Sequence, residues 1–260
     1  STDPALIWVG SNKSIIGSGS DAIIEGFGFH VSGFDDEVQD RVNDRWCEEN
    51  TVGEGLYEPA DYVSNVIIRN LTFKDYVDDG ISVSCFSHHI WIDHNTFLPG
   101  YDGALDIKRG SDLVTISWNY FNQTQKTSLV GHNDSYAWSD DGRLRVTYHH
   151  NFFKNTLRRT PKVRYGLVHV FNNYALEVPE ELTGTTDPDV FLEADVGSEI
   201  YAEANVLDGE SFDASQVQDP SAKHTWADSN IISKMRNSGR QQTTGDAFDP
   251  IMFYSYSVDD

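Results

Sequence analysis

The sequence has no run of about 18 apolar residues, the length that a membrane-spanning helix requires. It also has no G-x-S-x-G motif, the turn that exposes the nucleophile of many serine hydrolases. Amphipathic helical stretches of useful length are missing as well, and a doubly wound α/β fold needs them to cover its sheet. The sequence therefore argues against a helical membrane protein, a serine hydrolase of that type and an α/β fold.

Basic residues are scarce, because 19 lysines and arginines stand against 41 acids, a formal net charge of −22. That charge repels polyphosphates, so we expect no nucleic-acid partner. The missing apolar run gives no reason to expect a membrane partner. An acidic surface fits an extracellular or a salt-tolerant protein, and we expect a secreted monomer. The two cysteines, Cys47 and Cys85, permit one disulfide, although Cys85 lies in an apolar stretch and fits a buried thiol equally well.

Six segments alternate apolar and polar residues, and each carries an asparagine near its end. The segments are 65–73, 89–97, 113–121, 145–153, 167–175 and 199–207, with Asn70, Asn95, Asn119, Asn151, Asn173 and Asn205. Successive asparagines lie 22 to 32 residues apart. Alternation with a period of two indicates strands, and a repeat of this length without helices fits the turns of a coil. A propeller would need longer repeats with four strands each.

The repeated asparagine has two physical uses. Asparagine tolerates left-handed backbone at a turn, and its amide can bond to equivalent asparagines on the turns above and below. We therefore predict an all-β fold, a right-handed single-stranded parallel β-helix, with one domain over residues 1–260. Residues 34–64 are expected to form a long loop, and residues 208–260 to leave the repeat and pack on the last turns. Six antiparallel strands in a sandwich are the alternative.

Charged residues fall in the same part of successive repeats. They are Asp79, Asp102, Asp106, Lys108, Lys126, Arg159 and Arg164, which follow the preceding asparagine by seven to thirteen residues. Because neighbouring turns stack about 4.8 Å apart, four turns place these groups on one wall within about 15 Å. In the segment 104–108, Leu105 and Ile107 should point into the core, while Asp106 and Lys108 point outward.

The three aspartates supply hard oxygen ligands, which suit calcium or magnesium. A solvated acidic face is the alternative in a chain with 41 acids. The run 154–164 holds five bases and no acid, which indicates a local anionic partner unless these bases pair with acids on neighbouring turns. Adjacent histidines such as His149 and His150 should point to opposite faces of a strand, so we do not expect them to share a zinc ion.

Five segments resemble the pectate lyases of polysaccharide lyase family 1. They are WIDH (91–94), DGALDIK (102–108), LVGHNDS (129–135), VTYHHNFF (146–153) and RTPKVRYGLVHVFNN (159–173). The resemblance runs from about residue 11 to residue 207, and FDPIMFYSYS (248–257) also resembles the family's ending. The R-x-P-x-x-R segment preceded by W-I-D-H is highly specific.

The resemblance implies a role for each matching residue. Asp79, Asp102 and Asp106 match the calcium carboxylates, Arg159 matches the base, and Lys108, Lys126 and Arg164 match groups that hold substrate carboxylates. One position departs from the pattern of some members, because Val77 stands where they carry a further calcium carboxylate. Related pectin lyases act on methyl-esterified chains and lack these carboxylates, so the resemblance favours unesterified polygalacturonate.

The implied reaction is a calcium-dependent β-elimination that gives 4,5-unsaturated oligogalacturonides. An arginine base would act best in alkaline solution, so we expect an alkaline activity optimum. Two other functions stay open on the sequence. A non-catalytic polysaccharide-binding β-helix would keep the basic wall without needing the base or the metal. A galacturonan hydrolase of the same fold would need paired aspartates as acid and base and would give saturated products.

Overall fold

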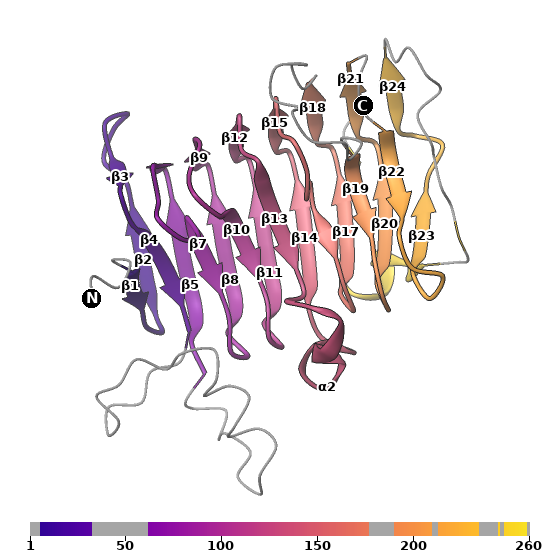
Figure 1. The fold of residues 1–260 in the computed structure, drawn as a ribbon, viewed down its shortest axis with the longest axis horizontal. Coiled ribbons are helices and arrows are strands. Elements are labelled where there is room, and N and C mark those ends of the chain that lie inside the picture. Colours follow the sequence, from indigo (N-terminus) through magenta and orange to yellow (C-terminus); the bar gives the residue numbers. More distant parts are fainter. Residues whose placement is uncertain are drawn as a thin grey trace, which may run out of the picture.

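The chain winds through short strands that follow one another around the three faces of a coil (Figure 1). The structure is a computed structural model that describes residues 6–32, 62–176, 190–209, 213–233, 244 and 247–258. Each strand pairs in parallel with strands of the preceding and following turns, which produces three sheets of eight strands each. This arrangement is a right-handed parallel β-helix, and it confirms the fold predicted from the repeat.

Each turn of the coil passes through sheet A, then sheet B and then sheet C. Sheet A contains β1 (Leu6–Val9), β4 (Gly28–Val31), β7 (Ile81–Val83), β10 (Gly103–Ile107), β13 (Lys126–Val130), β16 (Lys162–Val163), β19 (Val190–Ala194) and β22 (Asp213–Val217). Sheet B contains β2 (Lys13–Ile16), β5 (Ser64–Arg69), β8 (His88–Asp93), β11 (Asp112–Ser117), β14 (Arg145–His149), β17 (Leu167–Phe171), β20 (Glu199–Glu203) and β23 (Lys223–Trp226). Sheet C contains β3 (Ile23–Glu25), β6 (Thr72–Lys74), β9 (Thr96–Phe97), β12 (Tyr120–Asn122), β15 (Phe152–Lys154), β18 (Tyr174–Leu176), β21 (Val206–Asp208) and β24 (Ile231–Ser233).

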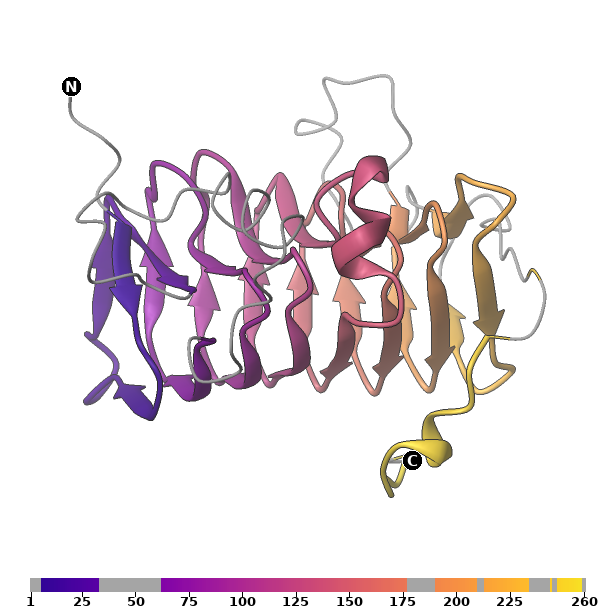
Figure 2. The same ribbon diagram turned by 90° about the horizontal axis from the view of Figure 1, so that it is seen from below.

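Helical structure is confined to short excursions among the described residues. The 3-10 helix η2 (Asp134–Tyr136) and the helix α2 (Ala137–Asp140) lie between β13 and β14 and project from the side of the coil (Figure 2). A further 3-10 turn, η4 (Pro250–Met252), lies near the C-terminus. No helix in the described parts of the chain is long and apolar enough to cross a membrane.

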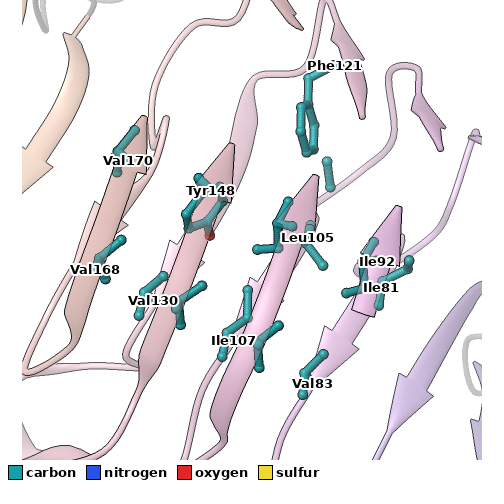
Figure 3. Close-up of a cluster of buried hydrophobic side chains, with 14 of the residues drawn as sticks. Ile81, Val83, Ile92, Leu105, Ile107, Phe121, Val130, Tyr148, Val168 and Val170 are labelled. Carbon is teal, nitrogen blue, oxygen red and sulfur yellow. The ribbon is translucent and has the colours of Figure 1, made fainter. Parts of the chain in front are cut away.

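The interior of the coil is filled by aliphatic and aromatic side chains from all three sheets (Figure 3). Phe73, Phe97, Phe121 and Phe153, one on each of four successive turns, are fully buried and stack nearly face to face. Their ring centroids lie 4.9 to 5.1 Å apart, which is the spacing of the strands themselves. In-register pairing thus dictates which side chains meet in the core.

Asparagines form a continuous ladder between sheets B and C, and all but the last are buried. Its members are Asn95, Asn119, Asn151, Asn173, Asn205 and Asn230. From Asn119 onward, the side-chain oxygen of each member accepts from the side-chain amide and the backbone N–H of the previous member, at 2.9 to 3.2 Å. The side-chain amide also donates to a backbone carbonyl in the sheet B strand of the preceding turn, which satisfies groups that the tight corner would otherwise bury without partners.

The ladder differs in two respects from the sequence prediction. Asn70 is not a member, because the Leu71 N–H takes its place and donates to Asn95 Oδ1 at 3.1 Å. Asn70 instead has left-handed backbone with φ of 57°. The left-handed residue of the later turns precedes the ladder asparagine, and these residues are His94, Trp118, His150, Asn172 and Ala204. The asparagine column therefore serves hydrogen bonding, and its neighbour makes the turn.

The repeat extends further than the sequence predicted, because residues 213–233 still belong to it. They form β22, β23 and β24, which pair in register with β19, β20 and β21 and add another complete turn. The alternating pattern is weak there, and Asn230 is the surviving signal. Beyond this turn the chain does pack back on the coil, because the Tyr254 hydroxyl bonds to Thr147 Oγ1 at 3.0 Å and to His169 Nδ1 at 2.6 Å.

The expected loop at residues 34–64 falls largely outside the described residues, as does Cys47, and its last residue, Ser64, already belongs to β5. Cys85 is disulfide-bonded, which answers the choice between a disulfide and a buried thiol in favour of the disulfide. Cys47 is the only other cysteine of the chain.

Replacing a ladder member tests the importance of the corner. Asn151→Ala leaves the Asn119 backbone and side-chain N–H groups buried without an acceptor, and each such loss costs about 1–3 kcal/mol. We expect a loss of about 2–5 kcal/mol in the free energy of unfolding, measured by denaturant titration. Asn122→Ala in β12 makes the same chemical change outside the ladder and should cost less than about 0.5 kcal/mol. Equal losses of unfolding free energy in the two variants would show that the ladder hydrogen bonds do not stabilise the fold.

Candidate active site on the outer face of sheet A

The outer face of sheet A carries a column of side chains in register. Ser82, Asp106, Leu129, Lys162 and Glu193 occupy equivalent positions on five successive turns. Within β10, Leu105 and Ile107 point into the core, and the Asp106 side chain lies on the opposite side of the strand. The alternation expected from the sequence therefore holds at this strand, and it delivers a carboxylate to the outer wall.

Three carboxylates meet beside β10. Asp79 and Asp106 are each only 4% exposed, whereas Asp102 is more open to solvent. Gly103 separates them, because a methyl group added to its Cα would stand 2.5 Å from Asp106 Oδ1 and 2.8 Å from Asp79 Oδ1. A residue without a side chain at position 103 is thus required for the two buried carboxylates to approach one another.

The electrostatics of the cluster are those of confined like charges. Burial, followed by the charge of Asp79, raises the pKa of Asp106 to about 7, although the positive charges of Lys108 and Arg159 oppose this shift. Burial is also the main reason why the pKa of Tyr76 is raised, and Asp79, Asp106 and Asp102 add to that shift in this order. All three carboxylates therefore act on the volume beside Tyr76, although Asp106 is not in the group of acids whose ligand atoms all lie within 4.8 Å of one another.

This volume fits a hard divalent cation. Its donors are carboxylate oxygens, which calcium and magnesium prefer, and an added positive charge would relieve the repulsion that raises the pKa of Asp106. Potential ligand atoms of Asp78, Asp79 and Asp102 all lie within 4.8 Å of one another. Asp78 was not among the residues selected from the sequence. The sequence could have indicated Asp78, because it lies next to Asp79 and directly follows Val77, the position where some family members carry a further carboxylate.

Lysines already balance part of this charge. Lys108 Nζ lies 2.9 Å from Asp79 Oδ2, and Lys126 Nζ lies 2.7 Å from Asp102 Oδ1. The Lys108 side chain is only 13% exposed, so its ion pair is shielded from solvent. The wall thus brings the predicted carboxylates together with two of the predicted cations, and each of these cations pairs with one carboxylate.

The basic run 154–164 divides into paired and unpaired members. Lys162 Nζ lies 3.1 Å from Asp195 Oδ2, and Arg164 bonds to both Asp195 and Asp134 at 3.2 and 2.7 Å. Pairing with acids of neighbouring turns, the alternative left open by the sequence, therefore holds for these two residues. No ion pair joins the Arg159 guanidinium to an acid of the described residues. Arg159 is the member of the run that faces the carboxylate cluster as an unpaired cation.

A bulge positions Arg159. Lys126 pairs with Arg158, and Leu129 pairs with Lys162, so two residues of β13 stand opposite three residues, 159–161, of the next turn. Arg159 has left-handed backbone with φ of 58°, and the following Thr160–Pro161 peptide is cis. A bulge of this kind bends a strand and re-aims a side chain. The sequence indicated the importance of Arg159 but gave no sign of the bulge.

The histidines arrange themselves differently from the sequence prediction. His149 and His150 do not point to opposite faces, because their Nδ1 atoms lie 2.8 Å apart. His150 has left-handed backbone, which turns its side chain toward that of its neighbour. Among the described residues, the acidic group at Asp78, Asp79 and Asp102 is the only cluster with metal-ligand spacing, and it contains no histidine.

The fold and this wall together define a parallel β-helix with a carboxylate cluster and basic groups on one outer face. A family model described as pectate lyase matches residues 51–259. That match covers most of the chain, and the chain belongs to the pectate lyase family, as the resemblance in the sequence predicted.

Individual relatives agree with this assignment. The pectate trisaccharide-lyase of Thermotoga maritima is 45% identical over 137 residues, which cover 48% of this chain and 37% of that protein. The pectate lyase of Bacillus subtilis is 31% identical over 249 residues, which cover 82% of this chain and 51% of that protein. A solved pectate lyase bound to a hexasaccharide superposes with a TM-score of 0.67 at 26% identity, over 90% of this chain and 60% of that one. The chain therefore spans between about a third and a half of these curated relatives.

Removing the Asp106 charge tests the electrostatics of the cluster. The raised pKa means that folding disfavours the ionised form, so the ion-free protein loses stability as pH rises from about 4 through 7. Asp106→Asn keeps the oxygen that accepts from Leu129 N–H but removes the charge. In chelator at pH 8, its melting temperature should equal or exceed that of the wild type, and the advantage should disappear at pH 5.

Asp79→Asn is the matched control, because it takes the ion-pair partner from the buried Lys108 and should lower the melting temperature at pH 8. If Asp106→Asn were also clearly less stable than the wild type at pH 8, the carboxylate cluster would not be under electrostatic repulsion.

Proposed function

We propose that this chain is a calcium-dependent pectate lyase that cleaves α-1,4-linked polygalacturonate by β-elimination. The observation that supports this function most is the meeting of a buried, mutually repelling carboxylate pair with an unpaired arginine on one wall of a pectate lyase family member. The structures of relatives bound to a hexasaccharide and to trigalacturonate support a polyuronate as the ligand.

Asp79, Asp102 and Asp106 would hold the calcium ion, and Asp78 stands close enough to assist. When bound, calcium would supply positive charge beside the carboxylate of the reacting sugar, which makes the proton on the neighbouring carbon easier to remove. Because all of these ligands are oxygens, the donor set disfavours zinc and copper.

The lysines of the wall are placed to change partners. Lys108 pairs with Asp79, and Lys126 pairs with Asp102. A cation bound by those aspartates would take over this role, and the ammonium groups could then pair with carboxylates of the polymer. Arg164, which lies one turn further along, would hold another. A protein with a net charge of −22 would thereby present a local basic strip to an acidic polymer.

Arg159 would act as the base. In its neutral form, after giving up a proton to solvent, it would take the proton from C5 of a galacturonate residue, the electrons of that C–H bond would form the C4–C5 double bond, and the C4–O bond to the neighbouring sugar would break. The departing oxygen would receive a proton from solvent. Arg159 suits this role because it is partly exposed and faces Asp106 without an acidic partner of its own among the described residues.

We also propose that the protein works outside the cell as a monomer. Its acidic composition and the disulfide at Cys85 support an extracellular setting, because disulfides persist in oxidising compartments. The acidic composition also supports the absence of nucleic-acid partners.

The decisive assay follows the ultraviolet absorbance of the unsaturated product. With polygalacturonate and calcium, the absorbance should rise steadily, and a chelator should abolish the rise until calcium is restored. Highly methyl-esterified pectin should react more slowly, because it lacks carboxylates for the basic groups. Binding without any absorbance would support the polysaccharide-binding alternative, and new reducing ends without absorbance would support a hydrolase.

Arg159→Lys tests the base. Lysine keeps the positive charge but cannot reach the same position, so we expect turnover to fall by at least about 10²-fold while binding of polygalacturonate, measured by calorimetry, is nearly unchanged. Lys154→Arg, a conservative exchange in sheet C, is the control and should keep full turnover. Substantial turnover by Arg159→Lys would contradict the assignment of Arg159.

A further inference from the structure

The Arg159 bulge needs a partner for its backbone. A residue inserted into a parallel strand is displaced from the regular ladder, and its N–H group loses the carbonyl that it would otherwise meet. The Arg159 carbonyl still accepts from Ser128 N–H at 2.6 Å. The Arg159 N–H instead donates to a side chain, Glu193 Oε1, at 2.8 Å.

Glu193 holds the bulge at two points. It lies in β19, on the turn that follows Arg159, and is only 7% exposed. Its own backbone N–H donates to the carbonyl of Pro161 at 3.1 Å, while its carboxylate accepts from Arg159 N–H. Glu193 is therefore hydrogen-bonded to both the first and the last residue of the three-residue segment 159–161.

The Glu193 carboxylate is itself fixed by the next turn. Gln218 Nε2 donates to Glu193 Oε2 at 3.0 Å, and Gln218 Oε1 accepts from Lys162 Nζ at 2.6 Å. Lys162 Nζ also lies 3.7 Å from Glu193 Oε2. Hydrogen bonds thus connect Arg159 to Glu193, Glu193 to Gln218, and Gln218 to Lys162, which lies three residues after Arg159. Gln218, which directly follows β22, thereby links the last described turn to the backbone of Arg159 through Glu193.

We infer that Glu193 is a positioning residue for Arg159, and that Gln218 orients it. The left-handed backbone of Arg159, with φ of 58°, is costly for an arginine and needs such a hold. Without the hold, residues 159–161 can relax, and the guanidinium leaves its place opposite Asp106. This inference rests on the proposed function where it concerns turnover, and on the structure alone where it concerns the backbone of Arg159.

Glu193→Ala tests the inference by kinetics. A base displaced by about 1 Å can cost on the order of 10²-fold in rate, so kcat should fall by about that factor. KM should change less than about threefold, because Lys108, Lys126 and Arg164 do not depend on Glu193. The control is Glu199→Ala, which breaks the pair with Lys223 on sheet B of the same turn and should leave kcat unchanged.

An exchange of the two side chains separates positioning from general stability. In Glu193→Gln the new amide meets the amide of Gln218, so the network is broken and kcat should fall. In Glu193→Gln combined with Gln218→Glu, the amide oxygen still accepts from Arg159 N–H, the amide donates to the new carboxylate, and Lys162 keeps an acceptor. The double variant should recover kcat to within about fivefold of the wild type. Failure to recover, or a loss confined to KM, would overturn the inference.

Crystal structures of the wild type and Glu193→Ala decide the point without relying on activity. We expect left-handed Arg159 in the wild type and a changed backbone in the variant. An Arg159 with unchanged φ and side-chain position in the variant would overturn the inference, even if the wild type showed no lyase activity. A wild type without lyase activity but with the expected change would contradict only the proposed function.

Discussion

Parallel, in-register pairing between successive turns is the constraint on which the rest of the structure depends. Because every turn repeats the path of the one before it, equivalent residues form columns, and neighbours within a column lie about 4.8 Å apart. The phenylalanine stack, the asparagine ladder and the outer column of sheet A are three consequences of this single rule. A column allows like side chains to support one another where the interior is apolar. It also forces charged groups together where they lie on the wall.

Beside β10, the parallel stacking brings charged side chains close together. Burial, together with the charge of the neighbouring Asp79, raises the pKa of Asp106, so the ionised pair is unfavourable for folding. The same arrangement is favourable for a divalent cation, and two lysines already pair with the neighbouring acids. If the cluster holds a cation as proposed, stability and function oppose each other there, as is common where a site binds a ligand that carries the compensating charge.

Much of the fold followed from the sequence because the pattern is periodic. Alternation and the asparagine spacing predicted strands, parallel stacking and the outward direction of Asp106, since each depends only on local residue order. The last turn was missed because residues 213–233 pair through their backbone while their side chains depart from the pattern. The position of Asn70 was misjudged for a related reason, because a shift of one residue moves a side chain from the ladder to the turn.

The residues of the proposed site could be named one by one only through resemblance to a family, and the side chains with which they pair could not be named at all. Lys108 and Lys126 were selected as ligands for the polymer, yet nothing in the sequence says that they pair with Asp79 and Asp102 in the ion-free protein. The bulge at Arg159 and its hold by Glu193 depend on the register between turns that lie more than 30 residues apart. Such register cannot be read from local pattern.

The central claim is that the coil collects Asp79, Asp102, Asp106 and Arg159 around one cation and one sugar. A crystal structure of Arg159→Lys with calcium and trigalacturonate tests it most directly. The account predicts one calcium ion in contact with those aspartates and a sugar carboxylate, on the outer face of sheet A. A sugar bound to sheet B, or calcium bound away from Asp79 and Asp106, would contradict it.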